Sequence, residues 1–299
     1  MIKMYCCFTI CFIGFIPGIS SQSATIISTK DSPQATYAAA MIERSLVKKG
    51  YFITEAKADY VITLAVNAGT LTSEAYSIVP ERKKITITGG DTRGLIYGSL
   101  SLEEDVRNGI PLQQIKSVSE KPKLPFRAIK FDLPWDTYRH SYALDLHVET
   151  CRDTNYWEAF LNMMVENRFN TLTLWNLHPY TYMIRAKNFP EASPFNDSEM
   201  KAWQDLFHSI FRMAGERAIE TYIIPFNIFV SPAFAKAYNV SMDNLDHHFF
   251  GQGDTAEIIK RYTRECVTQV LQEYPELTGF GLTHGEYMGG MTLSSAKNG

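Results

Sequence analysis

The chain has 299 residues, of which 45% are hydrophobic and 20% are charged. This is the composition of an ordinary globular protein, and it excludes disordered, collagen-like and coiled-coil chains. The 29 basic and 32 acidic residues leave a formal charge of −3. Because there is no surplus of cations to hold a polyphosphate, we expect no nucleic-acid partner.

The N-terminus has the order of segments that is typical of a secretory signal peptide. Lys3 precedes an apolar run over residues 4–16, and Pro17 and small polar residues follow it. The run is shorter than the roughly 20 residues that a membrane span needs. We therefore expect residues 1–23 to be removed and the mature chain to be secreted or periplasmic, with no membrane partner. A retained N-terminal anchor is the alternative.

Removal of the signal leaves two cysteines, Cys151 and Cys266. They favour two buried thiols over a disulfide framework, and no spacing of Cys and His is that of a structural zinc site. No predicted strand is followed by a Gly-x-Gly-x-x-Gly turn that would bind a dinucleotide. We therefore expect no metal and no organic cofactor.

Residues 24–120 predict a small α/β domain, in which strands alternate with helices of apolar periodicity. A turn signal at 80–83 predicts a hairpin within it. The expected strands are 24–28, 59–66, 75–79 and 84–88, and the expected helices are 32–49 and 92–106.

A Pro-rich joint at 121–125 marks the boundary to a second domain, residues 121–299. Here near-continuous apolar strands alternate with helices, which is typical of a parallel sheet with helices outside it. The expected strands are 126–133, 171–175, 220–227 and 277–283, and the expected helices are 156–167, 198–219 and 256–273.

Long segments rich in aromatic and polar residues follow the predicted strand ends. This favours a (β/α)8 barrel, because such barrels build their sites from these loops. The predicted strands are too few for a complete barrel, which takes about 250 residues. We therefore expect an α/β protein in which a small N-terminal domain precedes the first half of a (β/α)8 barrel, in a truncated chain.

The sharpest candidate for chemistry lies in the stretch Gly-Phe-Gly-Leu-Thr-His-Gly-Glu, which ends at Glu286. A buried strand leads to His284 and Glu286, at the end of the sheet where barrels place catalytic groups. Glu286 is the candidate general acid for cleaving a glycosidic bond, and His284 is a candidate substrate-binding residue. A structural Glu that binds backbone N–H groups of a neighbouring loop is the alternative.

A second group of candidates would bind the substrate. Trp175 and Asn176 end the second predicted barrel strand and His178 follows them, while Trp135 follows the first strand and Asn227 ends the third. Aromatic faces suit the C–H groups of sugars, and amide and imidazole groups suit their hydroxyls. Each residue taken singly is more typical of a core or loop position, but their concentration at strand ends favours a site.

Four further charged residues lie near the first barrel strand and could belong to the site. Asp132 and Asp136 are alternative carboxylates, and Asp132 is expected to be structural because it lies within the strand pattern. Arg127 and Lys130 could meet a sugar carboxylate, although a solvated face is the default for such a pair. The Asp/His cluster at 243–248 is not expected to bind metal, because adjacent histidines point in different directions.

The stretch Ile-Thr-Ile-Thr-Gly-Gly-Asp-Thr-Arg-Gly-Leu-Ile-Tyr-Gly, residues 85–98, resembles a pattern in the small N-terminal domains of two families. These are the family 67 α-glucuronidases and, more distantly, the family 20 β-hexosaminidases. The Pro-x-x-Pro-Phe-Arg joint fits the same layout. The hexosaminidases carry an Asp-Glu pair at the fourth strand, whereas Gly285 precedes Glu286 here. The lone Glu is more similar to the α-glucuronidases, whose Trp-Asp-Asn signature is echoed in part by Trp135 and Asp136.

This resemblance implies an exported bacterial hydrolase that acts on oligosaccharides or polysaccharides without a cofactor. Glu286 would protonate the leaving oxygen, and a carboxylate beyond Gly299 would activate water. Two alternatives stay open. One is a non-catalytic carbohydrate-binding protein on the same barrel, and the other is a barrel enzyme of different chemistry, such as a lyase or a deacetylase.

Overall fold

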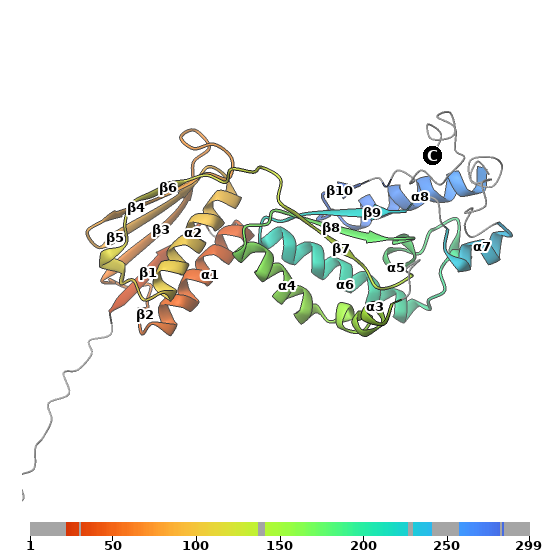
Figure 1. Cartoon of the computed structure of the whole chain (residues 1–299), viewed down its shortest axis with the longest axis horizontal. Coiled ribbons are helices and arrows are strands. Elements are labelled where there is room, and N and C mark those ends of the chain that lie inside the picture. Colours follow the sequence, from red (N-terminus) through yellow and green to blue (C-terminus); the bar gives the residue numbers. More distant parts are fainter. Residues whose placement is uncertain are drawn as a thin grey trace, which may run out of the picture.

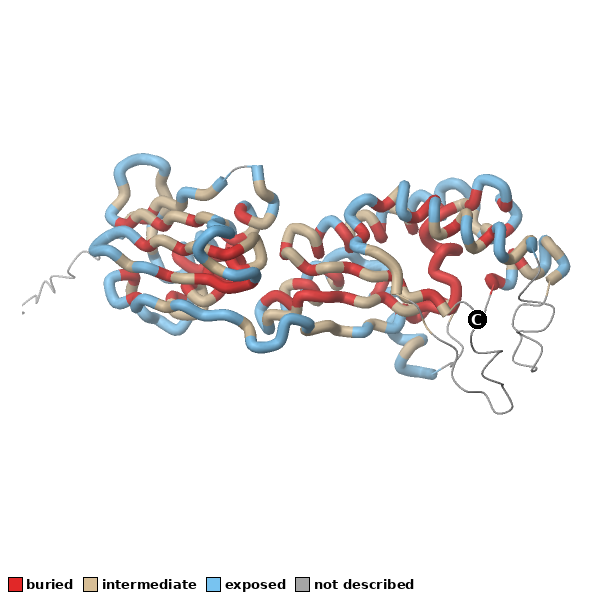
Figure 2. The backbone as a smooth tube through the Cα atoms, turned by 90° about the horizontal axis from the view of Figure 1, so that it is seen from above, coloured by how far each residue is buried: buried red, intermediate tan, exposed pale blue. Residues whose placement is uncertain are grey.

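The structure of the chain is a computed structural model that describes residues 22–29, 31–136, 141–226, 230–240, 257–281 and 283. These residues form two bodies arranged along the long axis of the molecule, each with its own sheet (Figure 1). Each body has its own buried interior, and the Pro-rich joint at 121–125 connects them (Figure 2). The expected fold class, a small α/β domain followed by parallel β/α units, is confirmed.

The N-terminal body is a mixed sheet that packs against two helices. Its elements are β1 (Ser23–Ile27), α1 (Pro33–Lys48), β2 (Phe52–Ile53), β3 (Tyr60–Val66), β4 (Tyr76–Glu81), β5 (Lys84–Gly89), α2 (Thr92–Arg107) and β6 (Val118–Glu120), with a 3-10 turn at Leu112–Gln114. The strand order is β2-β1-β3-β5-β4-β6, and β4 runs antiparallel to both of its neighbours. The predicted hairpin is therefore present, and its turn is the two residues 82–83 because β4 extends to Glu81.

Local signals in the sequence start both helices of this body. The Ser32 hydroxyl accepts a hydrogen bond from the backbone N–H of Ala35, and the Asp91 carboxylate accepts one from Gly94. Asp91 also accepts hydrogen bonds from the hydroxyl of Ser73 (2.6 Å) and the backbone N–H of Glu74 (3.0 Å). The cap of α2 thereby also ties down the loop that precedes β4.

Two glycines let α2 lie directly on the sheet. A Cβ at Gly98 would come within 2.7 Å of the Ile87 side chain, and one at Gly94 would collide with the backbone of Ala75. Both glycines belong to the Gly-Leu-Ile-Tyr-Gly stretch in which the family resemblance was seen. The physical content of that motif is close packing of a helix on β4 and β5.

The C-terminal body is a parallel sheet in chain order. Its elements are β7 (Ala128–Asp132), α3 (Tyr142–His147), α4 (Thr154–Glu166), β8 (Thr171–Asn176), α5 (Tyr180–Met183), α6 (Asp197–Glu216), β9 (Glu220–Pro225), α7 (Pro232–Tyr238), α8 (Glu257–Glu273) and β10 (Gly279–Phe280), with 3-10 turns at Thr150–Arg152 and Pro190–Ala192. The order β10-β9-β8-β7 is that of consecutive β/α units. Three short helices, α3, α5 and α7, lie in segments expected to be irregular.

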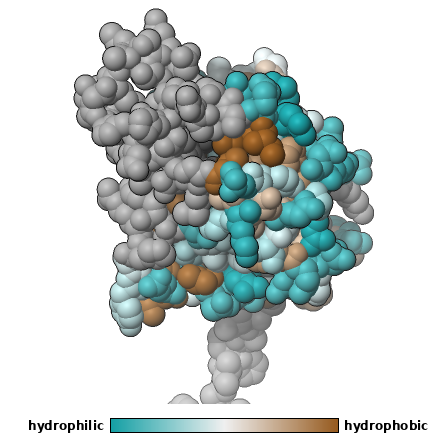
Figure 3. All heavy atoms as spheres, turned by 90° about the vertical axis from the view of Figure 1, so that its right-hand side faces the viewer, coloured by the Kyte–Doolittle hydropathy of each residue, from teal (hydrophilic) through white to brown (hydrophobic). Residues whose placement is uncertain are grey.

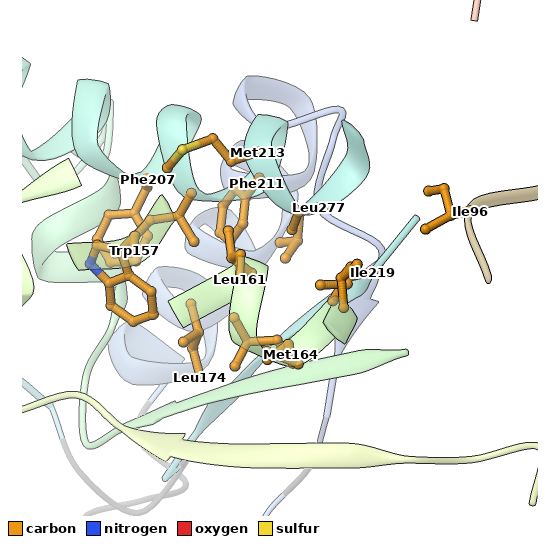
Figure 4. Packing of buried hydrophobic residues seen from close by; sticks show 14 of the residues in the cluster. Ile96, Trp157, Leu161, Met164, Leu174, Phe207, Phe211, Met213, Ile219 and Leu277 are labelled. Atoms are coloured by element: carbon orange, nitrogen blue, oxygen red, sulfur yellow. The ribbon is translucent and has the colours of Figure 1, made fainter. Parts of the chain in front are cut away.

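One face of this sheet forms the core of the body. Leu172, Leu174 and Ile223 are fully buried there, beneath α4 and α6. Figure 4 shows Trp157 of α4 and Phe207 of α6 pointing into the same layer between the helices and β8. Alternate residues of the strands point to the opposite face, which is more exposed and more polar, as the next section describes.

Charged side chains join the two bodies at the N-terminal ends of the barrel strands. The Glu74 carboxylate pairs with Arg93 (2.8 Å) and with Arg127 (2.9 Å), and it accepts a hydrogen bond from the Asn170 amide (2.8 Å). Arg93 also pairs with Glu220, at the start of β9 (3.2 Å). Arg127 is therefore not on a solvated face, because it links β7 to the N-terminal body.

The electrostatics of this junction favour the charged form of Glu74. Burial by itself would raise the pKa of the carboxyl. Hydrogen bonds from Asn170, Arg127 and Arg93 outweigh burial and hold the pKa of Glu74 below its ordinary value. In barrels this end of the strands serves stability rather than catalysis, so we assign the junction a structural role.

The two cysteines outside the predicted signal segment are both buried free thiols, as expected. Burial raises the pKa of Cys151 to about 11 and that of Cys266 to about 12, so neither is a ready nucleophile. Within the described ranges, no helix combines the length and apolar character needed to cross a bilayer.

Candidate functional site

The C-terminal ends of β7 and β8 bring together several of the predicted site residues. Trp135 follows β7, Asn176 ends β8, and His178 comes just after it. This is the end of a parallel sheet at which barrels carry their active sites. Figure 3 looks onto the molecule from this side, where the described surface is mostly hydrophilic with a few hydrophobic patches.

Three predicted residues fall outside the described part of the chain. They are Asn227, His284 and Glu286. The strand pattern that precedes each of them is present, since β9 ends at Pro225 and β10 spans Gly279–Phe280. Their roles stay predictions.

Trp135 anchors the segment after β7 in the interior. Its side chain is 5% exposed, and its ring packs edge-on against Trp203 of α6 with centroids 4.7 Å apart. Tyr182 of α5 lies 5.7 Å from it, and the indole N–H donates to the Val148 carbonyl. The ring is thus part of the core rather than a pocket wall, and what it contributes to a site is the position of the next residue, Asp136.

Asn176 ties the two strand ends together. Its side-chain amide donates to the backbone carbonyl of Trp135, and its side-chain oxygen accepts the backbone N–H of His178 at 3.0 Å. The residue is 1% exposed, so both hydrogen bonds are shielded from water. Asn176 therefore positions the segments on either side of it and is itself too buried to bind substrate directly.

His178 faces the carboxylate of Asp136, which the sequence offers as an alternative site carboxylate. Its Nε2 lies 3.7 Å from Oδ2 of Asp136, and the Tyr182 phenol is near enough to the same carboxylate for that charge to help raise the phenol pKa. His178 and Tyr182 are both buried, whereas the Asp136 side chain is 33% exposed. These three residues, Asp136, His178 and Tyr182, form what we call the Asp136 cluster.

Burial controls the protonation of the two inner members of the cluster. It lowers the pKa of His178, and the nearby Asp136 carboxylate opposes this only in part. Burial, and then the Asp136 charge, raise the pKa of Tyr182 well above its ordinary range. Near neutral pH, a neutral imidazole and a neutral phenol therefore face an accessible carboxylate.

Trp175 lies on the other face of the sheet from the Asp136 cluster. Its ring is partly exposed and packs against Phe226, with centroids 5.9 Å apart. The ammonium of Lys130 stands 4.9 Å above the ring and is paired with Asp132. Asp132 and Trp175 are register partners in β7 and β8, so these side chains share one face. The structure thus separates Trp175 from Trp135, Asn176 and His178.

The residue that the sequence underrated is Asp136, and the one it missed is Tyr182. The left-handed backbone of Asp136 (φ 50°) has no signal in the residue types around it. Tyr182 belongs to the Tyr-Thr-Tyr-Met run, in which only the three-dimensional position separates a core ring from one that lies near a carboxylate. Over the described ranges, no group of three or more His, Cys, Asp or Glu residues is placed to hold a metal ion.

The pH dependence of stability should report the buried, neutral His178. Because its pKa is lowered below the ordinary 6.5, the unfolded chain binds a proton that the folded chain excludes. Below pH 6.5 the wild type should lose up to about 1.4 kcal/mol per pH unit from this residue, until the folded pKa is reached. The His178→Asn variant should lack this contribution. Urea unfolding across a pH series measures both slopes, and equal slopes would contradict the assignment.

Comparison with known proteins places the chain among glycoside hydrolase folds. Residues 19–118 match the family model of glycosyl hydrolase family 20, domain 2. This stretch contains residues 85–98, so the resemblance to family 20 is confirmed there, whereas the resemblance to family 67 stays a prediction. No curated protein matches the chain.

Solved structures extend the likeness beyond the N-terminal body. A GH138 enzyme targeting pectin rhamnogalacturonan II matches 92% of the chain at 25% identity, with a TM-score of 0.78. The β-N-acetylhexosaminidase of Bacteroides fragilis matches 85% of the chain (14% identity, TM-score 0.54), and a β-hexosaminidase of Streptomyces plicatus matches 84% (14%, 0.56). The last two show the fold alone.

The chain spans only part of each of these proteins. It covers 32% of the GH138 chain, 51% of the Bacteroides chain and 53% of the Streptomyces chain. These matches show that the chain has a glycoside hydrolase fold.

Proposed function

We propose that this chain carries the N-terminal domain and the first β/α units of an exported glycoside hydrolase that acts on uronate-containing plant polysaccharides. The observation that carries the proposal is the match over 92% of the chain, at a TM-score of 0.78 and 25% identity, to an enzyme that targets a pectin. Pectins are rich in uronic acids, and this supports a substrate that carries uronate groups. The order of residues 1–23 supports export.

In this proposal Glu286 is the general acid. It comes six residues after β10 in the sequence, and barrels build their sites from segments that follow the strands. A carboxylic acid there would donate its proton to the glycosidic oxygen as the bond to the sugar breaks, through an oxocarbenium-like state.

Trp175 and Lys130 support binding of an acidic sugar. A partly exposed indole face offers a stacking surface for sugar C–H groups, and the ammonium of Lys130 lies 4.9 Å from that ring. Asp132 neutralises Lys130 in the absence of ligand. A uronate carboxylate would compete with Asp132 for the ammonium and so gain a charged partner beside the stacking surface.

The proposal is tested by hydrolysis with the full-length product of the gene. Aryl glucuronides, aryl galacturonides and pectic oligosaccharides are the substrates, and Glu286→Gln is the test variant. We expect kcat to fall by roughly 10²–10⁴-fold, because proton donation to the leaving group is lost. The fall should be smaller for aryl groups that leave readily, since these need little protonation.

The matched control is Glu276→Gln, which changes a partly exposed carboxylate before β10 and should leave kcat unchanged. Binding of oligosaccharides without any turnover by the wild type would instead support the carbohydrate-binding alternative. Turnover of these substrates that is insensitive to Glu286→Gln would refute the assignment of the acid.

A further inference from the structure

The backbone of Asp136 adopts a conformation that is unusual for its residue type. Its φ of 50° lies in the left-handed region, which Asp and Asn tolerate better than other residues with a Cβ. Residues held in this way cluster at functional sites, where surrounding contacts maintain a particular side-chain position. Here the surrounding contacts are the core ring of Trp135 and the hydrogen bond from Asn176 to the carbonyl of Trp135.

The carboxylate of Asp136 has buried side chains on one side and is accessible from the other. Nε2 of His178 faces it at 3.7 Å, and the Tyr182 phenol is near enough to feel its charge. Both of these side chains are more than nine-tenths buried, whereas the Asp136 side chain is 33% exposed. Among the described residues, the basic side chain that this carboxylate contacts is His178.

The imidazole of His178 also has unused hydrogen-bonding capacity. Because Nε2 faces a carboxylate, we place the proton on Nε2, which leaves Nδ1 as an acceptor. Nδ1 is buried and has no hydrogen-bond partner within the described ranges. Buried polar atoms in this state occur where a ligand or an ordered water completes the site.

We infer that Asp136 is a substrate-binding residue whose carboxylate accepts hydrogen bonds from hydroxyl groups of the bound sugar, with Tyr182 and His178 as positioning residues. The inference deepens the proposed function and rests on it. An ionised carboxylate offers about four acceptor positions. Its negative charge repels a uronate carboxylate, so it contacts the hydroxyl-bearing part of the sugar while the acidic group is directed elsewhere.

The test measures sugar binding by the Asp136→Asn variant with titration calorimetry. Asn tolerates the left-handed backbone and keeps a side-chain oxygen that accepts hydrogen bonds, so the variant removes the charge and little else. The probes are a short oligogalacturonide and, in parallel, N-acetylglucosamine. Whichever of the two sugars the wild type binds, we expect the Asp136→Asn variant to bind it about tenfold or more weakly than the wild type. The thermal midpoint of unfolding should not change.

Two further variants separate binding from structure. Asp145→Asn removes an exposed carboxylate of α3 and should leave the affinity at the wild-type value. Tyr182→Phe keeps the ring packing but removes the phenol hydroxyl near the carboxylate, and we expect a severalfold loss of affinity in the folded protein. Wild-type affinity in Tyr182→Phe would overturn its role as a positioning residue.

The outcomes distinguish this inference from the proposed function. Equal affinities of the wild type and Asp136→Asn would overturn the inference and leave the hydrolysis result untouched. Failure of the wild type to bind either sugar would also overturn it, while the cleavage assay with Glu286→Gln decides separately whether the protein is a hydrolase. Loss of affinity in Asp136→Asn together with normal binding by Glu286→Gln would support the inference.

Discussion

The Glu74→Gln variant is expected to lose about 3–5 kcal/mol of the free energy of unfolding. Gln keeps the size of the side chain but removes the charge that pairs with Arg93 and Arg127, both mostly buried at the junction. Two guanidinium groups would then face each other without a carboxylate between them. Because Arg93 keeps Glu220 as a partner, we expect the lower half of this range. Urea unfolding at neutral pH is the measurement.

The matched control removes an exposed ion pair. Asp205 pairs with Lys201 one turn away on α6, and both side chains are more than half exposed. Asp205→Asn should therefore change the free energy of unfolding by less than about 0.5 kcal/mol. If the two variants were equally stable, the junction would contribute no more than a surface pair, and the structural role assigned to Glu74 would be wrong.

Acidification should reproduce the effect of the Glu74 substitution. The pKa of Glu74 is lower in the folded chain than its ordinary value of 4.5, so its contribution to stability is complete above that pH. The contribution is lost as the pH falls through the folded pKa. The difference in stability between the wild type and Glu74→Gln should therefore shrink as the pH is lowered below 4.5.

The two tryptophans predicted for the site should respond in opposite ways to replacement by Ala. Trp135→Ala should cost about 3–5 kcal/mol of the free energy of unfolding, because its ring fills the layer between Trp203 and Tyr182. Trp175→Ala should cost less than about 1.5 kcal/mol, because its ring is partly exposed on the opposite face of the sheet. Urea unfolding measures both values.

Sugar binding provides the second readout for this pair of variants. Trp175→Ala should abolish most of the affinity for the oligogalacturonide in a folded protein, since it removes the proposed stacking surface. A large loss of stability in Trp175→Ala with unchanged binding in the surviving folded fraction would place Trp175 in the core and remove it from the site.

Periodicity and caps predicted the elements of the fold closely. The helix expected at 92–106 spans Thr92–Arg107, and that expected at 156–167 spans Thr154–Glu166. These helices are long, have clear apolar faces and begin at Asp91 and Asp153, whose side chains cap them. Of the expected strand at 277–283, Gly279–Phe280 form β10, which pairs with β9 at the edge of the described sheet.

The candidate site was predicted less completely than the fold. The concentration of Trp135, Asn176 and His178 at strand ends was visible in the sequence, because strand ends follow from hydrophobic patterning. Their separate roles were not visible in the sequence. Trp135 is a buried anchor, Asn176 connects two loops and His178 faces a carboxylate, yet all three have a similar local sequence context. The pairing of His178 with Asp136 joins residues that follow two different strands and depends on the register of β7 and β8.

The sequence by itself determined the long helices and the main strands, that they alternate as β/α units, and which strand ends collect polar and aromatic residues, whereas the short elements β2, β6, α3, α5 and α7 were not predicted. These properties depend on the spacing of side chains along one segment, which is local. The tertiary structure decided that Glu74 joins the two bodies, that Trp135 and Trp175 lie on opposite faces, and that His178 faces Asp136. Such contacts depend on which segments meet in space, and the order of residues along the chain does not encode those distances locally.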